Sequence, residues 1–173
     1  MTAAVDDGSC AYVLGADGLA RWREPFSGAW FGLLQASRQL TRELESRLDA
    51  RVGLSLSGLE LLGRLAAADG RRMRLSELAG ATGLTLSRIS RIVDTFEERG
   101  LVERHTCSKD GRATNAWLTE AGLDLAREAQ AAHVEDVQRL FFARLSTEEL
   151  ETLAAAFARV APPATAPDEN GTT

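Results

Sequence analysis

Apolar residues recur every three or four positions along most of the chain, which is typical of amphipathic helices that pack on a core. Near residue 102 the pattern changes to two short strand-like runs around a polar segment, SKDGR. We therefore expect a mainly α fold with a small β hairpin. The expected helices span residues 26–51, 57–70, 75–82, 85–99, 119–144 and 146–161, and the expected strands run from Val102 to Cys107 and from Thr114 to Leu118.

Residues that suit helix ends mark several of these boundaries. Pro25 stands where a helix can begin, and Gly53 stands where a left-handed residue can end one. Residues 57–60 (SGLE) and 146–149 (STEE) have the spacing of capping boxes, in which a serine and a glutamate satisfy free backbone N–H groups. Thr119 is the expected N-cap of the long helix behind the hairpin.

The helices at 75–82 and 85–99 are separated by Gly83, and this order of helix, glycine turn and helix is typical of a helix-turn-helix unit. The second helix of such a unit normally enters the major groove of DNA. The hairpin that follows would make a winged version. We expect this winged helix-turn-helix at about residues 55–119.

The remaining segments predict dimerisation helices and two flexible ends. With 173 residues and 45% hydrophobic composition, the chain fits one globular domain, at 25–161, with additional helices. The helices at 26–51 and 119–161 carry more apolar surface than a small winged domain can bury, which favours a homodimer. Residues 1–24 are expected to be a flexible arm with one short structured piece from Leu19 to Trp22, and residues 162–173 a disordered tail.

The distribution of charge fits a nucleic-acid partner, although the net charge is −5. Residues 71–112 contain nine Lys or Arg and six Asp or Glu, a local charge of +3, and the rest of the chain carries −8. Only the face near phosphates has to be positive. No apolar run is long enough for a membrane span, and the acidic N-terminus does not resemble a signal peptide, so we expect a cytoplasmic location.

The outer face of the helix at 85–99 supplies the main candidates for DNA contact. Arginine can pair in a bidentate way with guanine, and hydroxyl side chains can contact bases or phosphates. The alternative is a solvated amphipathic face. Asp94 is expected to orient an arginine instead of meeting DNA, because phosphates would repel its carboxylate. The candidates on this helix are Thr85, Ser87, Arg88, Ser90, Arg91 and Thr95.

The wing tip and the segment before the helix-turn-helix add further basic candidates. Lys109 and Arg112 lie in the tip, where Asp110 can hold the Arg112 guanidinium in a pose that suits the minor groove. The alternative is a polar Asp-Gly turn. Arg71, Arg72 and Arg74 precede the helix-turn-helix and either contact phosphate or contact no DNA.

Three stretches together resemble the multiple-antibiotic-resistance repressor (MarR) family of bacterial winged-helix regulators, and the similarity covers about residues 27–160. They are SRIVDTFEERGLVER at 90–104, Asp110-Gly-Arg112 at the tip, and residues 118–122 (LTEAG) behind it. The resemblance implies a homodimer that represses transcription from a pseudo-palindromic operator. It also implies release by a small phenolic or anionic effector bound between the dimerisation and DNA-binding parts. It does not explain the arm.

Trp30, Phe31 and Arg38 are candidates for an effector pocket, since an aromatic wall with one arginine suits an aromatic carboxylate, but the two aromatic residues also fit a dimer core with Arg38 as a surface charge. A protein-interaction module without DNA binding remains an alternative. No catalytic constellation or cofactor motif is present, so an enzyme is not expected.

Two further alternatives are a redox-sensing regulator that uses Cys10 and a zinc site. Cys10, with Tyr12 nearby, resembles the sensor of oxidation-sensing members of the family, but it has no basic neighbour to lower its pKa. His105, Cys107 and His133 match no standard zinc spacing.

Overall fold

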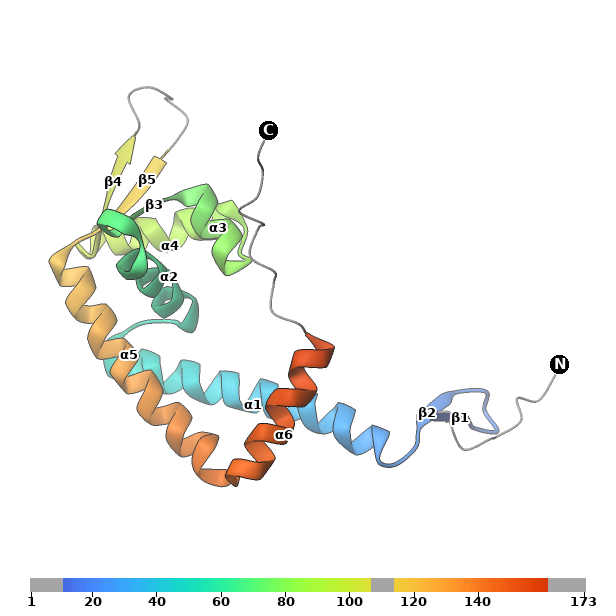
Figure 1. Ribbon diagram of the computed structural model, residues 1–173. Helices are drawn as coiled ribbons and strands as arrows, with labels where there is room; N and C mark the ends of the chain where they lie inside the picture. Colours follow the sequence, from blue (N-terminus) through green and yellow to red (C-terminus); the bar gives the residue numbers. More distant parts are fainter. Residues whose placement is uncertain (1–10, 107–113, 162–173) are drawn as a thin grey trace, which may run out of the picture.

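The computed structural model describes residues 11–106 and 114–161, and these residues form six α-helices and two small antiparallel sheets (Figure 1). The mainly α fold with a β wing is therefore confirmed. The helices are α1 (Phe26–Val52), α2 (Leu56–Ala67), α3 (Leu75–Thr82), α4 (Leu86–Glu98), α5 (Glu120–Leu140) and α6 (Thr147–Val160). The strands are β1 (Tyr12–Leu14), β2 (Ala20–Trp22), β3 (Arg72–Arg74), β4 (Val102–Thr106) and β5 (Thr114–Leu118).

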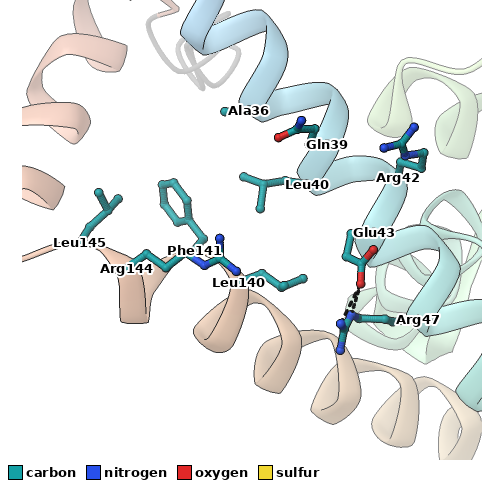
Figure 2. A pocket seen from close by; sticks show the side chains of 10 residues that line it. All are labelled: Ala36, Gln39, Leu40, Arg42, Glu43, Arg47, Leu140, Phe141, Arg144 and Leu145. Carbon is teal, nitrogen blue, oxygen red and sulfur yellow. Dashed lines mark hydrogen bonds and ion pairs between the residues drawn. The ribbon is translucent and has the colours of Figure 1, made fainter.

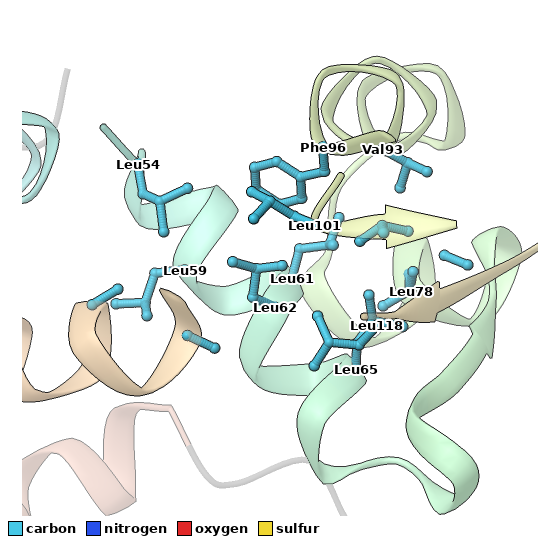
Figure 3. Close-up of a cluster of buried hydrophobic side chains, with 14 of the residues drawn as sticks. Leu54, Leu59, Leu61, Leu62, Leu65, Leu78, Val93, Phe96, Leu101 and Leu118 are labelled. Atoms are coloured by element: carbon cyan, nitrogen blue, oxygen red, sulfur yellow. The ribbon is translucent and has the colours of Figure 1, made fainter. Parts of the chain in front are cut away.

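The hydrophobic core lies in the winged unit, around α2 (Figure 3). Leu61, Leu62 and Leu65 of α2 are completely buried, together with Leu78 of α3 and Val93 of α4. Leucines at positions i, i+1 and i+4 cover a wide stripe of α2, so this helix contacts its neighbours on more than one side. The core holds α3 and α4 at a fixed angle, with Gly83 in the turn between them at a φ of 68°.

The sheet of the winged unit has three strands in the order β3-β5-β4, one more than the sequence predicts. Met73 pairs with Ala116, and Ala116 is completely buried. Three residues are too few for alternation to be visible, so β3 is recognisable only through its partner. The inner face of this sheet packs on the helices.

Three of the expected helix ends are confirmed, and the expected cap of α2 is wrong. Gly53 ends α1 with a φ of 64°, Thr119 caps α5 by accepting from the Gly122 N–H at 3.0 Å, and residues 146–149 form the expected capping box. The cap of α2 is Ser55 and not Ser57, since the Ser55 hydroxyl accepts from the Gly58 N–H at 3.0 Å. Serine occurs at both positions, and only the backbone path selects between them.

The long helix behind the wing is shorter than expected. It ends at Leu140 instead of Arg144, and a short 3₁₀ helix, η2 (Phe142–Arg144), leads into α6. In contrast to α2, the helices α1 and α6 bury little. Leu48 is the only buried residue of α1, and α6 has none.

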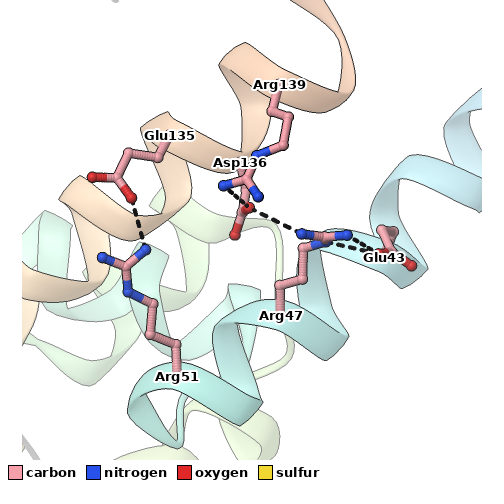
Figure 4. A network of polar contacts seen from close by, with 6 residues as sticks. All are labelled: Glu43, Arg47, Arg51, Glu135, Asp136 and Arg139. Carbon is pink, nitrogen blue, oxygen red and sulfur yellow. Dashed lines mark hydrogen bonds and ion pairs between the residues drawn. The ribbon is translucent and has the colours of Figure 1, made fainter.

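An ionic network ties α1 to α5 (Figure 4). Asp136 is 6% exposed and lies 3.5 Å from the Arg47 guanidinium and 3.3 Å from that of Arg139. Next to it, Arg51 donates to Glu135 at 2.7 Å and holds the pKa of that carboxyl below its ordinary value. A buried carboxylate is tolerated only where it is paired, so these contacts fix how the two helices cross.

The first described residues form a hairpin, where the sequence suggested a flexible arm with one short structured piece. Strand β1 pairs with β2 in the register Tyr12 with Trp22, Val13 with Arg21 and Leu14 with Ala20. The hairpin lies at the outer end of α1, away from the winged unit (Figure 1). Every residue of both strands is exposed.

Candidate nucleic-acid interface

Helix α4 has one buried face and one exposed polar face. Ile89 and Val93 are completely buried and Phe96 is 4% exposed, which fixes the rotation of the helix. Thr85 caps the helix by accepting from the Arg88 N–H at 3.3 Å. Residues at the intervening positions must then face away from the core. The exposed candidates are Thr85 at the cap and Ser87, Arg88, Arg91 and Thr95 in the helix.

Several of these side chains meet at one place on the helix surface. A shallow hollow of about 300 Å³ is lined by Arg88, Arg91, Ile92 and Thr95. Arg88 also reaches Ser57 on α2, with a guanidinium nitrogen 3.5 Å from the hydroxyl. Two guanidinium groups with free donors beside a hollow can pair with acceptor groups such as phosphate oxygens or the edge of guanine.

Ser90 does not share this environment, because its side chain is half-buried against Arg104 of β4. The Arg104 guanidinium donates to the Ser90 carbonyl at 2.8 Å and contacts its hydroxyl at 3.2 Å. It also pairs with Asp94 at 2.6 Å and with Glu97 at 3.5 Å. The expectation that Asp94 orients an arginine agrees with this geometry. Arg104 thus fastens the wing to one flank of α4 and neutralises acids that would otherwise repel phosphate.

Sequence reasoning did not single out Arg104, although a signal for it exists. Val102 is 1% exposed and Arg104 follows it by two positions, so both lie on the inner face of the sheet. A charged residue on an inner face requires partners. Ser90, Asp94 and Glu97 stand at i, i+4 and i+7 of the neighbouring helix and supply them.

The three arginines before α3 contact α5 and the sheet of the winged unit. Arg71 pairs with Glu120 of α5 at 2.5 Å. Arg72 and Arg74 alternate with Met73 and therefore lie on the outer face of the sheet. There the Arg72 guanidinium sits 5.3 Å from the centre of the Trp117 ring, a cation–π distance. Arg72 thus has a packing contact whether or not it meets DNA.

The expected wing-tip residues Lys109, Asp110 and Arg112 lie outside the described residues, as do Cys10 and Cys107. The base of the wing is described.

At that base the segment that leads into β4 packs closely against the start of α5. The Thr119 hydroxyl donates to the Gly100 carbonyl at 2.8 Å, and the Thr119 N–H donates to Leu101 at 3.1 Å. A Cβ at Gly122 would lie 2.1 Å from the Leu101 carbonyl oxygen. The LTEAG stretch therefore has a steric reason for its glycine.

Two grooves lie beside α1 and α5. One, of about 540 Å³, is bounded by α1 and the end of α5, and Figure 2 shows Leu40 and Phe141 pointing into it. The other, of about 420 Å³, separates α2 from α5. The expected effector residues Trp30, Phe31 and Arg38 are exposed on α1 and line neither groove.

The described residues, 11–106 and 114–161, contain no group of three or more His, Cys, Asp or Glu side chains that could hold a metal ion. No helix in these ranges is long and apolar enough to cross a membrane.

Comparison with known proteins identifies the relatives of this chain. A sequence model of the MarR family matches residues 52–113. The crystal structure of AbsC, a MarR family transcriptional regulator from Streptomyces coelicolor, is similar with a TM-score of 0.73 and 37% identity, covering 82% of this chain and 95% of that one. Sco3205 from the same organism, a MarR family regulator solved in complex with DNA, has a TM-score of 0.74 and 32% identity, covering 82% and 89%.

A probable transcriptional regulator from Pseudomonas aeruginosa also matches, with a TM-score of 0.64 and 27% identity over 76% of this chain and 95% of that chain. These relatives are regulators, which confirms that the chain is not an enzyme. The identities of 37% to AbsC and 32% to Sco3205, each over 82% of this chain, together with the shared fold, show that the chain belongs to the MarR family of transcriptional regulators.

Proposed function

We propose that this protein is a homodimeric, sequence-specific DNA-binding repressor, whose α4 helices read the two halves of a pseudo-palindromic operator. The observation that carries the proposal is the exposed face of α4, which presents Ser87, Arg88, Arg91 and Thr95 while its other face is fixed in the core. The complex of the similar regulator Sco3205 with DNA supports the same use of this fold.

The electrostatics of α4 favour this role. Arg104 pairs with Asp94 and Glu97, so acids on one flank of the helix are occupied. Arg88 and Arg91 stay exposed on the other side. Bidentate pairing of either arginine with guanine would discriminate bases, and the hydroxyls would contact bases or backbone. In this proposal the Arg112 guanidinium, held by Asp110, enters the minor groove beside it, and Lys109 lies in the same wing tip.

The helices outside the winged unit support a homodimer. Helix α6 has 14 residues and buries none of them, and isolated helices of this length are marginal in water. Phe157 is 43% exposed and Val160 79% on α6, and Phe26 and Phe31 are 44% and 55% exposed on α1. A second copy that covers these side chains would supply the missing packing.

We further propose that a small effector releases the DNA. The groove between α2 and α5 lies along the contact of the winged unit with α5, so a ligand there could change their relative position. His133 lines this groove, and its Nδ1 is buried with no hydrogen-bond partner in the described structure. Trp30, Phe31 and Arg38 would form a second site only if the partner subunit encloses them. Salicylate, titrated against the DNA complex, is a suitable aromatic carboxylate probe.

A mobility-shift assay tests the central part of this proposal. The full chain is titrated onto a duplex from the region flanking its own gene and onto a scrambled duplex, at one salt concentration. Specific affinities normally exceed non-specific ones by a factor of about 10³ or more. Equal affinity for the two duplexes would contradict sequence-specific binding, and no binding to either would favour a winged helix that docks a protein partner.

A further inference from the structure

The N-terminal hairpin, β1 with β2, is amphipathic, and its apolar face is left uncovered by the described part of the chain, residues 11–106 and 114–161. The register places Tyr12, Leu14, Ala20 and Trp22 on one face and Val13 and Arg21 on the other. Tyr12 is 45% exposed, Leu14 68% and Trp22 49%. Antiparallel sheets with one apolar face normally bury that face.

A hairpin of this size is not stable in isolation. Two isolated strands are at best marginally stable in water, and the additional contacts inside this hairpin are few. Tyr12 and Trp22 meet edge to face at 6.2 Å, and Asp17 pairs with Arg21 at 2.5 Å. An exposed ion pair and one aromatic contact contribute about 1 kcal/mol or less each. A covering surface is therefore needed.

The path of α1 prevents the hairpin from using its own winged unit as that surface. The first eight residues of α1, from Phe26 to Leu33, bury no side chain and extend the helix by about 12 Å at 1.5 Å per residue. The junction is held by the Ser27 N–H, which donates to the Arg23 carbonyl at 2.9 Å. The hairpin is consequently held beyond the body of its own chain (Figure 1).

The apolar surface of the hairpin continues into α1 through Phe26, Trp30 and Phe31, which are 44%, 49% and 55% exposed. We propose that the hairpin is an arm whose apolar face packs on the dimerisation helices of a second copy of this chain. In a two-fold symmetric dimer each copy would give one arm and receive one. The inference rests on the proposed homodimer and adds to it a contact made by residues 12–22.

Two matched variants of the full chain test the arm. Leu14→Ser removes an apolar side chain from the covered face, and Val13→Ser makes a similar change one residue away on the opposite face. We expect Leu14→Ser to raise the dimer dissociation constant at least about tenfold, because two symmetry-related contacts are lost, and Val13→Ser to change it less than about twofold. Sedimentation velocity over a concentration series measures both. Equal dissociation constants for the two variants would overturn the inference.

Tryptophan fluorescence gives a second readout that uses neither Leu14→Ser nor Val13→Ser. In a chain with Trp30→Phe and Trp117→Phe, Trp22 should become less accessible to acrylamide as the concentration is raised through the dissociation constant. Accessibility that does not change would count against the arm.

Operator binding, measured on the wild-type chain, separates the outcomes. Specific binding with equal constants for the two variants removes the arm and leaves the proposed function. A stable wild-type monomer removes both the arm and the homodimer, and the DNA titration then decides sequence-specific binding by itself.

Discussion

At the scale of single residues, Arg88 is the side chain most suited to reading a base, because it stands in the first turn of α4 on the exposed face. Arg88→Ala should lower the affinity for the operator relative to the affinity for a scrambled duplex. The expected loss of discrimination is about 1–3 kcal/mol of binding free energy, which is what one bidentate base contact usually contributes. Arg72→Ala is the control, since Arg72 lies on the outer face of the sheet over Trp117 and should leave this discrimination unchanged. Titrations across a salt series measure both, and a parallel loss for the two duplexes in Arg88→Ala would place Arg88 on the phosphates instead.

Arg104 is a positioning residue, and its removal should affect both folding and DNA binding. Arg104→Ala leaves Asp94 and Glu97 without their cation, so we expect a loss of about 1.5–3 kcal/mol in the free energy of unfolding in urea. Operator affinity should fall as well, because α4 loses its tie to the wing. A double variant with Asp94→Ala and Arg104→Ala tests the coupling. If its loss of unfolding free energy equalled the sum of the losses in the two single variants, Asp94 and Arg104 would not be coupled.

At the scale of elements, the wing base and α5 approach each other closely at Gly122. Gly122→Ala would place a Cβ 2.1 Å from the Leu101 carbonyl oxygen, and the backbone would have to move. We expect a loss of about 1–3 kcal/mol in unfolding free energy. Gly80→Ala in α3 is the matched control, because a Cβ there meets no atom within 4 Å, and it should be neutral or stabilise by up to about 1 kcal/mol. Equal midpoints in urea for the two variants would refute the steric argument.

The elements also show what sequence patterns can and cannot predict. Helices with a strong apolar stripe, such as α2 and α4, and the caps at Thr119 and Ser146 follow from local spacing. Strand β3 and the role of Arg104 depend on pairing with residues far away in the chain, which no local window contains. The N-terminal hairpin is hard to predict for a related reason, since its alternating face packs on no core in the described part of the chain.

At the scale of the whole molecule, the surplus of exposed apolar surface on α1 and α6 predicts a dimer at micromolar concentration. Phe157→Glu should shift this equilibrium toward monomer, because a charge would be buried in an interface. Arg159→Glu, on the same helix, is the control for a change of charge alone. Light scattering measures the mass, and a wild-type chain that remains monomeric would contradict the dimer.

The most direct test of the account is a hydroxyl-radical footprint of the wild-type chain on the operator. Two α4 helices related by a two-fold axis should protect two segments on one face of the duplex, centred about one helical turn, roughly 34 Å, apart. The minor groove flanking each segment should be protected as well, where the wing enters. A single protected segment, or uniform protection without a preferred site, would contradict a dimer that reads DNA through α4.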